Sequence, residues 1–427
     1  MLGLEPRDEG MSENPKILYV VSNWPFDGTG AQQRALNIGR LLKRVGEVRL
    51  VVVTPGPENP HALRTMEREF KEWRVIQPTM VNRRNPFIRV WNRLQNSLGS
   101  HAYASRYWKV NAVNHRAFRD MMLESDVVWL HNFVTVNRFN FEKWPHTVLD
   151  VDDVPSVFYD SLARSRRSPL RRIVDVQTSR RLRKRERGLL NRFDVLTVCS
   201  EQDKVYLGGD KRVFVVPNGF TTPEIRPRIQ SARPRIGFIG MFGYRPNIEG
   251  MEWFLSDVWP LVTSRIEKAE LRLVGPGSDT FLSQKRSDVV GLGWLDNPTE
   301  EIASWSAMVV PIRVGGGTRI KIAEGFARKC PVISTSAGAF GYDVRNGEEL
   351  VLADFAGDFA SACVRLLRDP AFGDALANRA YQRFRREWTW DAFAPRVQAA
   401  VEACLSSRSS RSTGQKSAFA SNENPGS

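Results

Sequence analysis

The chain has 427 residues, of which 42% are hydrophobic and 10% aromatic, and its formal net charge is +15 at neutral pH. This length exceeds a single ordinary core and predicts two domains with a linker and tails. No apolar run is long enough to cross a bilayer, the first residues contain no apolar signal segment, and the four widely spaced cysteines form no metal-binding motif, so we expect a cytoplasmic protein without structural zinc.

The N-terminal part of the chain has the alternation of strands and helices that is typical of a parallel α/β sheet. Residues 1–14 are polar, and we expect them to be disordered. A buried-strand run at 16–22 is followed by a loop with Gly28 and Gly30, by a segment with helical apolar spacing and by a second apolar run at 48–54. This βαβ unit places a glycine loop at the carboxyl end of its first strand, where parallel sheets bind ligands.

Two later strands end in polar residues at the same edge of the predicted sheet. One ends in His131, whose imidazole could hydrogen-bond a substrate, although a structural histidine is the alternative. The next ends in three acids, Asp150, Asp152 and Asp153. Such acids can hold a divalent metal against a diphosphate, but we favour helix capping or pairing with nearby arginines, and we expect no metal.

Charge is concentrated between Ser161 and Arg192, where twelve Arg and Lys residues and two acids give a net charge of +10. Such a segment attracts phosphates or anionic lipid headgroups, and a solvated basic helix is the alternative. Basic and aromatic residues at 73–108 could contact a membrane or pack in a core. Because no nucleic-acid-binding motif accompanies the charge, we expect an anionic membrane surface as partner and no nucleic acid.

A proline- and arginine-rich stretch at 221–233 predicts the linker between two α/β domains, 15–220 and 234–387. An amphipathic helix at 388–405 follows the second domain. The segment 406–427 has little apolar content, and we expect a disordered tail.

The most informative stretch lies in the second domain, where a strand, the triple glycine 315–317, a helix and another strand follow one another. Glycines let the backbone turn sharply and approach a ligand, and Thr318 is the predicted N-cap of a helix whose free N–H groups would face an anion. Arg319 and Lys321 add cations, and Glu324 suits sugar hydroxyls. The alternative is an ordinary tight turn with solvated charges.

The stretch from Pro311 to Gly338 resembles the retaining GT-B glycosyltransferases usually grouped as family 4, through the motif P-x-R-x-G-G-G-T-R-x-K-x-x-E. Weaker matches are the Gly28-Thr-Gly30 loop, the Leu130-His131-Asn132 strand end, the Val216-Pro-Asn-Gly219 turn and Gly240. The resemblance implies an α/β protein of GT-B architecture, with two Rossmann-like domains facing each other across a cleft. The first would bind the acceptor and the second the donor, and the helix at 388–405 would pack back on the first.

The resemblance also implies a hexosyltransferase-type enzyme that moves a sugar from a UDP- or GDP-sugar to a glycan or lipid-linked acceptor, with retained configuration and no obligatory cofactor. It would act in the synthesis of a polysaccharide, glycolipid or envelope glycan, and the clustered positive charge leads us to expect it at the inner face of the cell membrane. Its implied catalytic residues are His131 near the transferred sugar, Arg319 and Lys321 at the diphosphate, and Glu324 at the ribose. The implied donor-binding residues are Gly28, Gly30, Gly240, Arg245, Gly315, Gly316, Gly317 and Thr318.

Two departures from the family pattern concern the donor site. The family's E-x7-E motif would place its first glutamate, which usually contacts the transferred sugar, at Gly316. Met241 and Glu249 stand where an Arg and a Lys are common, and we expect Arg245 and the cations of the later helix to compensate. A sugar-nucleotide epimerase and a noncatalytic binding protein of the same fold are the alternatives to a transferase.

Overall fold

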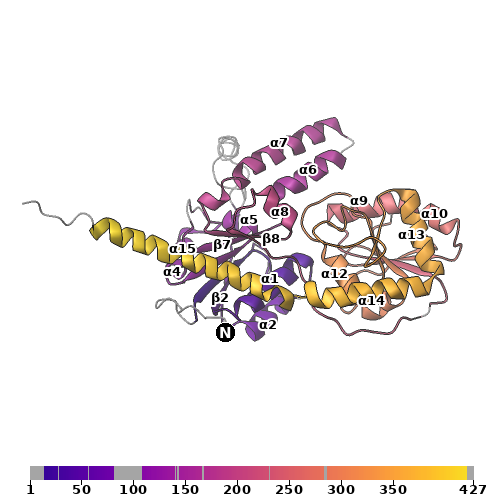
Figure 1. Cartoon of the computed structure of the whole chain (residues 1–427), viewed down its shortest axis with the longest axis horizontal. Helices are drawn as coiled ribbons and strands as arrows, with labels where there is room; N and C mark the ends of the chain where they lie inside the picture. The colour runs from indigo at the N-terminus through magenta and orange to yellow at the C-terminus, as the bar shows by residue number, and fades with distance from the viewer. Residues whose placement is uncertain are drawn as a thin grey trace, which may run out of the picture.

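A computed structural model describes residues 14–420 apart from 27, 56, 81–107, 140, 142–143, 166–167, 230 and 283–285. The predictions for residues 1–13, for most of the 73–108 stretch and for 421–427 therefore lie outside the described residues. The described chain forms two α/β lobes, and the last helix returns along the first lobe (Figure 1). Among the described helices, none is both long and apolar enough to cross a membrane.

The first lobe is built on a seven-stranded sheet with the order β3-β2-β1-β6-β7-β8-β9, in which every neighbouring pair is parallel. Its strands, in sheet order, are Glu72–Ile76, Glu47–Val53, Lys16–Val21, Val127–His131, Thr147–Asp152, Val195–Val198 and Val213–Val215. Its helices are α1 (Gly30–Leu42), α2 (Pro60–Glu69), α4 (Ala112–Leu123), α5 (Asn132–Val136), α6 (Pro155–Ser165), α7 (Pro169–Glu186) and α8 (Glu201–Tyr206). A 3-10 turn, η1 (Leu189–Asn191), and a short antiparallel pair, β4 (Thr79–Met80) with β5 (Trp108–Lys109), complete it.

The second lobe repeats this design with six parallel strands in the order β12-β11-β10-β13-β14-β15. Its strands, in sheet order, are Val289–Gly291, Glu270–Val274, Arg235–Ile239, Ala307–Val310, Val332–Ser334 and Val351–Leu352. Its helices are α9 (Arg245–Trp253), the π-helical turn η2 (Phe254–Val258), α10 (Trp259–Thr263), α11 (Thr299–Ala303), α12 (Ile320–Ala327), α13 (Ala356–Arg368) and α14 (Pro370–Glu387).

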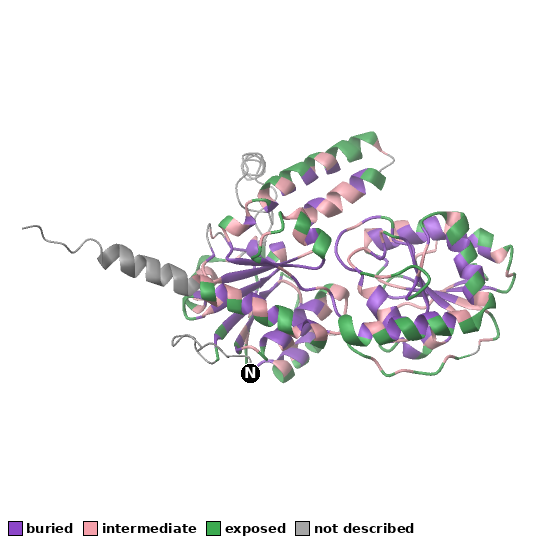
Figure 2. Cartoon of the chain, viewed as in Figure 1, coloured by how far each residue is buried: buried purple, intermediate pink, exposed green. Residues whose placement is uncertain are grey.

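Both sheets are buried on both faces, which explains why their strands are continuous apolar runs (Figure 2). In each sheet the chain order reverses beside the first strand, between β1 and β6 and between β10 and β13. Ligands of open α/β sheets bind at the carboxyl ends of the strands at such a reversal. These strand ends carry the Gly28 loop, His131, Gly240 and the triple glycine, so the fold gathers the residues that the sequence singled out.

The C-terminal segment crosses between the lobes after α14. A 3-10 turn, η3 (Asp391–Phe393), leads into α15 (Ala394–Ala420), which packs on α1 and on strands of the first sheet. The fully buried side chains of Val397 and Val401 lie on its contact face. The sequence analysis placed a helix at 388–405 and a disordered tail from 406, whereas the helix begins later and continues to residue 420. Its continuation is polar, so apolar periodicity gave no signal for it.

Candidate functional site

The triple-glycine loop of the second lobe touches the first lobe at several points. The backbone N–H of Gly315 donates to Ser161 Oγ at 2.7 Å, and the N–H of Asn218 donates to Thr318 Oγ1 at 3.2 Å. A Cβ atom added to Gly30 would lie 2.9 Å from Ile320 Cδ1. The two glycine loops that the sequence marked are therefore brought against each other at the boundary of the lobes.

The start of α12 differs by one residue from the prediction. The helix begins at Ile320, its N-cap is Arg319, and no side chain caps it, so the prediction of Thr318 as the cap was wrong. The hydroxyl of Thr318 instead accepts the hydrogen bond from the other lobe. Left-handed backbone at Gly315 (φ +127°) and Gly317 (φ +67°) makes the turn that delays the helix.

Arg319 is 8% exposed, and its guanidinium folds back under the loop. It donates to the carbonyl oxygens of Gly316 and Val314, while its Nε has no hydrogen-bond partner in the described part of the chain. The arginine therefore fixes the loop and leaves a positive charge directly beneath it.

Lys321 points into the second lobe rather than into solvent. Its Nζ lies 2.8 Å from Asn247 Oδ1 and 5.0 Å from the centre of the Phe238 ring. Burial, and then the neighbouring positive charge of Arg319, lower the pKa of Lys321 to about 7. A Cβ on Gly240 would lie 2.8 Å from Asn247 Nδ2, so the glycine allows the asparagine to approach. Lys321 and Gly240, far apart in sequence, thus share one cluster.

Glu324 pairs with Arg328 one turn later, at 3.2 Å. Burial raises the pKa of this carboxyl, against the opposing effect of Arg328. The charges of this helix are not simply solvated, as the alternative of an ordinary tight turn expects, because Lys321 and Glu324 each have a hydrogen-bonding partner within the second lobe. A carboxyl with only one cationic partner retains acceptor capacity for a ligand.

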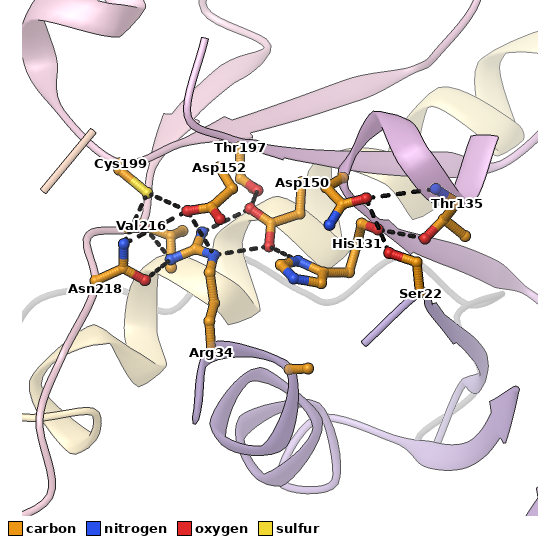
Figure 3. Close-up of polar contacts among 12 residues, drawn as sticks. Ser22, Arg34, His131, Thr135, Asp150, Asp152, Thr197, Cys199, Val216 and Asn218 are labelled. Atoms are coloured by element: carbon orange, nitrogen blue, oxygen red, sulfur yellow. Dashed lines mark hydrogen bonds and ion pairs between the residues drawn. The ribbon is translucent and has the colours of Figure 1, made fainter. Parts of the chain in front are cut away.

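His131 belongs to a buried ionic network in the first lobe (Figure 3). Its Nδ1 lies 3.0 Å from Asp150 Oδ2, and Arg34 grips the same carboxylate at 2.6 and 3.0 Å. Thr197 donates to it as well, at 2.7 Å. Burial alone would raise the pKa of Asp150, but Arg34 and then His131 hold that pKa well below its ordinary value.

The hydrogen-bond partner of Nδ1 determines which ring atom of His131 is available to a ligand. Because Asp150 is an ionised acceptor, Nδ1 of the ring carries a proton, and Nε2 has no hydrogen-bond partner among the described residues. Sequence reasoning missed Arg34, which is fully buried. A signal was present, since Arg34 occupies the i−4 position of Ile38 on the apolar face of α1, and a buried charge there needs a partner.

Asp150 and Asp152, the two acids within β7, pair with Arg34 as the arginine alternative expects. Asp152 lies 3.6 Å from Arg34 Nε and accepts a hydrogen bond from the thiol of Cys199 at 3.0 Å. Asp152, Asp153 and Cys199 lie close enough together to suggest a metal site. However, burial raises the pKa of Cys199 far above its ordinary value, so the sulfur is a protonated donor, and Asp152 is already paired with Arg34. This donor set fits arginine pairing better than a metal.

A cavity of about 1290 Å³ opens between the α6–α7 hairpin of the first lobe and α9 of the second. Two of the predicted donor-binding residues, Gly315 and Arg245, line it, and Arg245 is paired with Glu249 at 2.6 Å. Its other basic lining residues are Arg164, Arg171, Arg183 and Arg313.

Gly28 and Thr29 precede α1, and Thr29 forms a capping box with Gln32. The Gly28 loop is therefore held by the helix that follows it.

Comparison with known proteins gives a family match for the second lobe and a fold match for the whole chain. Residues 233–369 match the family model described as glycosyl transferases group 1. The sucrose-phosphate synthase of Thermosynechococcus elongatus is similar over 92% of this chain and 100% of its own, with a TM-score of 0.62 and 16% identity. The chain has the GT-B fold.

Two further solved structures are similar. HepE of Anabaena, in complex with UDP and glucose, matches over 92% of this chain and 100% of its own, with a TM-score of 0.55 and 14% identity. WaaG, a glycosyltransferase involved in lipopolysaccharide biosynthesis, matches over 90% and 98%, with a TM-score of 0.53 and 14% identity. Comparison with curated protein sequences gave no match. The family match of the second lobe and the fold together support sugar transfer as the activity.

Proposed function

We propose that the protein is a glycosyltransferase that moves a hexose from a UDP- or GDP-sugar to a glycan or lipid-linked acceptor with retention of configuration. The observation that carries this proposal is the meeting of the two glycine loops at the boundary, with Gly30 against Ile320 and Lys321 beside Gly240. Cations and free N–H groups at that point suit a diphosphate leaving group, whose developing charge they would stabilise.

Each charged residue of α12 has a role that follows from its position. The carboxyl of Glu324 would accept hydrogen bonds from the ribose, while Lys321 would bind the diphosphate from the base of the Gly240 loop. Arg319 would act mainly by holding the loop, because its guanidinium is engaged by loop carbonyl oxygens. The free Nε2 of His131 would accept a hydrogen bond from the transferred sugar.

A panel of nucleotide-sugars tests the proposal. Purified protein is incubated with UDP- and GDP-linked hexoses, with and without a mixture of glycan and polyprenyl-linked acceptors, and the release of nucleoside diphosphate is measured. We expect acceptor-dependent release with one donor, and NMR of the product should show the anomeric configuration of the donor. Isomerised donor without transfer would contradict the proposal, and so would the absence of any turnover across the panel.

We further propose that the enzyme works as a peripheral protein on an anionic membrane, with the α6–α7 hairpin as the contact. The start of α7 exposes three apolar side chains, Leu170 (77%), Ile173 (53%) and Val174 (60%). The same helix carries exposed cations that form no ion pair among the described residues: Arg171 and Arg172 beside the apolar side chains, and Arg180, Arg181, Lys184 and Arg187 further along it. An apolar tip within a basic surface is the composition that binds anionic lipid headgroups.

A further inference from the structure

Asp153 follows β7 and directs its carboxyl group across the boundary onto the triple-glycine loop. A Cβ atom added to Gly317 would overlap Asp153 Oδ1. Position 317 therefore requires glycine for two reasons. Its backbone is left-handed, and the Asp153 carboxyl occupies the space that a Cβ atom would need. The neighbouring position, Gly316, is where the resemblance leads one to expect a sugar-binding glutamate, and a Cβ there would face the start of α6, 3.7 Å from Val157 Cγ1.

The carboxyl of Asp153 has no hydrogen bond or ion pair among the described residues. This contrasts with Asp150 and Asp152 on the same strand, which are bound by Arg34, Thr197 and Cys199. A largely buried carboxyl without a partner is unfavourable for the folded protein, and such groups are usually completed by a ligand.

A residue of the second lobe that faces Asp153 also has unused hydrogen-bonding capacity. Arg319, whose charge acts on Asp153, is 8% exposed, and no described residue accepts a hydrogen bond from its Nε. Tyr244, from the loop that follows Gly240, lies within electrostatic reach of both groups: burial raises the pKa of its phenol, and Arg319 and Asp153 act on it in opposite directions. Asp153 of the first lobe and Arg319 and Tyr244 of the second thus lie within electrostatic reach of one another, and the Asp153 carboxyl and Arg319 Nε have unused hydrogen-bonding capacity.

We propose that Asp153 replaces the missing loop glutamate and binds a hydroxyl group of the transferred sugar. This inference rests on the proposed function and names how the sugar of the donor is recognised. A sugar hydroxyl both donates and accepts, so a carboxyl group in either protonation state can bind it. Because the nucleotide is bound by the second lobe and this carboxyl belongs to the first, the sugar contact depends on closure of the two lobes and couples closure to the correct sugar.

The test compares nucleotides with and without a sugar. Dissociation constants for UDP, UDP-glucose, GDP and GDP-mannose are measured by calorimetry for the wild-type protein, for Asp153→Ala and for Asp210→Ala. Asp210 is a matched control, because it belongs to the same lobe, does not line the cavity and is paired with Arg212. We expect Asp153→Ala to weaken binding of the preferred nucleotide-sugar about tenfold while the bare nucleotide binds unchanged, as for loss of one hydrogen bond. The control should change neither constant.

Three other outcomes would overturn the inference. If Asp153→Ala weakens the binding of nucleotide and nucleotide-sugar equally, Asp153 serves only to hold the two lobes together. If it weakens the binding of neither, Asp153 does not belong to the site. Both results leave the proposed transferase intact. If the wild-type protein binds none of the four compounds, the proposed function itself fails and the role of Asp153 fails with it. Thermal melting of each variant shows whether it is folded, and Asp153→Asn provides a near-isosteric second variant.

Discussion

The Nζ atom of Lys321 lies 2.8 Å from the side-chain oxygen of Asn247, which joins the first turn of α12 to the start of α9. This amine has a pKa of about 7, well below the ordinary value of 10.5, because it is buried beside Arg319. At neutral pH it is therefore divided between a cation and a neutral amine. The protonation of this one group makes both stability and donor use depend on pH.

Stability and donor use should change in opposite directions as pH rises. Between pH 7 and 10.5 the folded state holds fewer protons at Lys321 than the unfolded state, so this residue makes the free energy of unfolding rise with pH across that window. Use of the donor needs the cation, so kcat/KM for the nucleotide-sugar should fall as pH rises through about 7. Lys321→Arg remains charged and should flatten that fall. A profile of unchanged shape in this variant would assign the titration to another group.

The buried pair of Arg34 and Asp150 should be essential for stability. Asp150→Asn leaves the guanidinium without its charged partner in the core, and we expect a loss of about 3–5 kcal/mol in the free energy of unfolding, measured in urea. Because the pKa of Asp150 is lowered in the folded state, its contribution is present above its unfolded pKa and is lost as pH falls below about 4. The exposed pair of Arg49 and Glu72 is the control, and Glu72→Gln should cost at most about 1 kcal/mol. Equal losses would contradict this account.

Part of the fold and of the candidate site could be predicted from the sequence. The alternation of strands and helices, and the placement of Gly28, His131, Gly240 and the triple glycine at the carboxyl ends of strands, followed from apolar runs and from the rule for parallel sheets. What could not be predicted is pairing between distant side chains. Arg34 reaches Asp150 across 116 positions, and Asp153 meets Gly317 from another domain. Local patterns carry no information on such contacts, which depend on the final orientation of each side chain.

The exposed tip of α7 should decide membrane binding. In flotation with vesicles that contain anionic lipid, the wild-type protein should bind, and binding should weaken as salt rises. Ile173→Ser combined with Leu170→Ser should reduce binding strongly, because the apolar tip is lost while the charge is kept. Val113→Ser removes an equally exposed side chain from α4 and should have no effect. Equal binding of wild-type protein to neutral vesicles would refute the electrostatic part, and capture only by another protein would replace the membrane as partner.

Glu324 provides the sharpest distinction between binding and turnover at the donor site. A carboxylate bridging ribose hydroxyls makes the same charge-assisted bonds in the ground state and the transition state, so Glu324→Ala should raise KM for the donor and change kcat little. Lys321→Ala should instead lower kcat, on the order of a hundredfold, because its charge acts on the departing diphosphate. Arg319→Ala should lower kcat to a similar extent and also lower the melting temperature, since the loop carbonyl oxygens lose their donor.

The partner of Glu324 supplies the control for that experiment. Arg328→Ala removes the ion pair but leaves the carboxyl in place. If Glu324 serves only this ion pair, the two alanine variants should behave alike in stability and in KM. If it binds ribose, only Glu324→Ala should raise KM, and the loss should be equal for UDP and for UDP-sugars, since the ribose is common to both. Full activity and full donor affinity in both Glu324→Ala and Lys321→Ala would remove α12 from the active site.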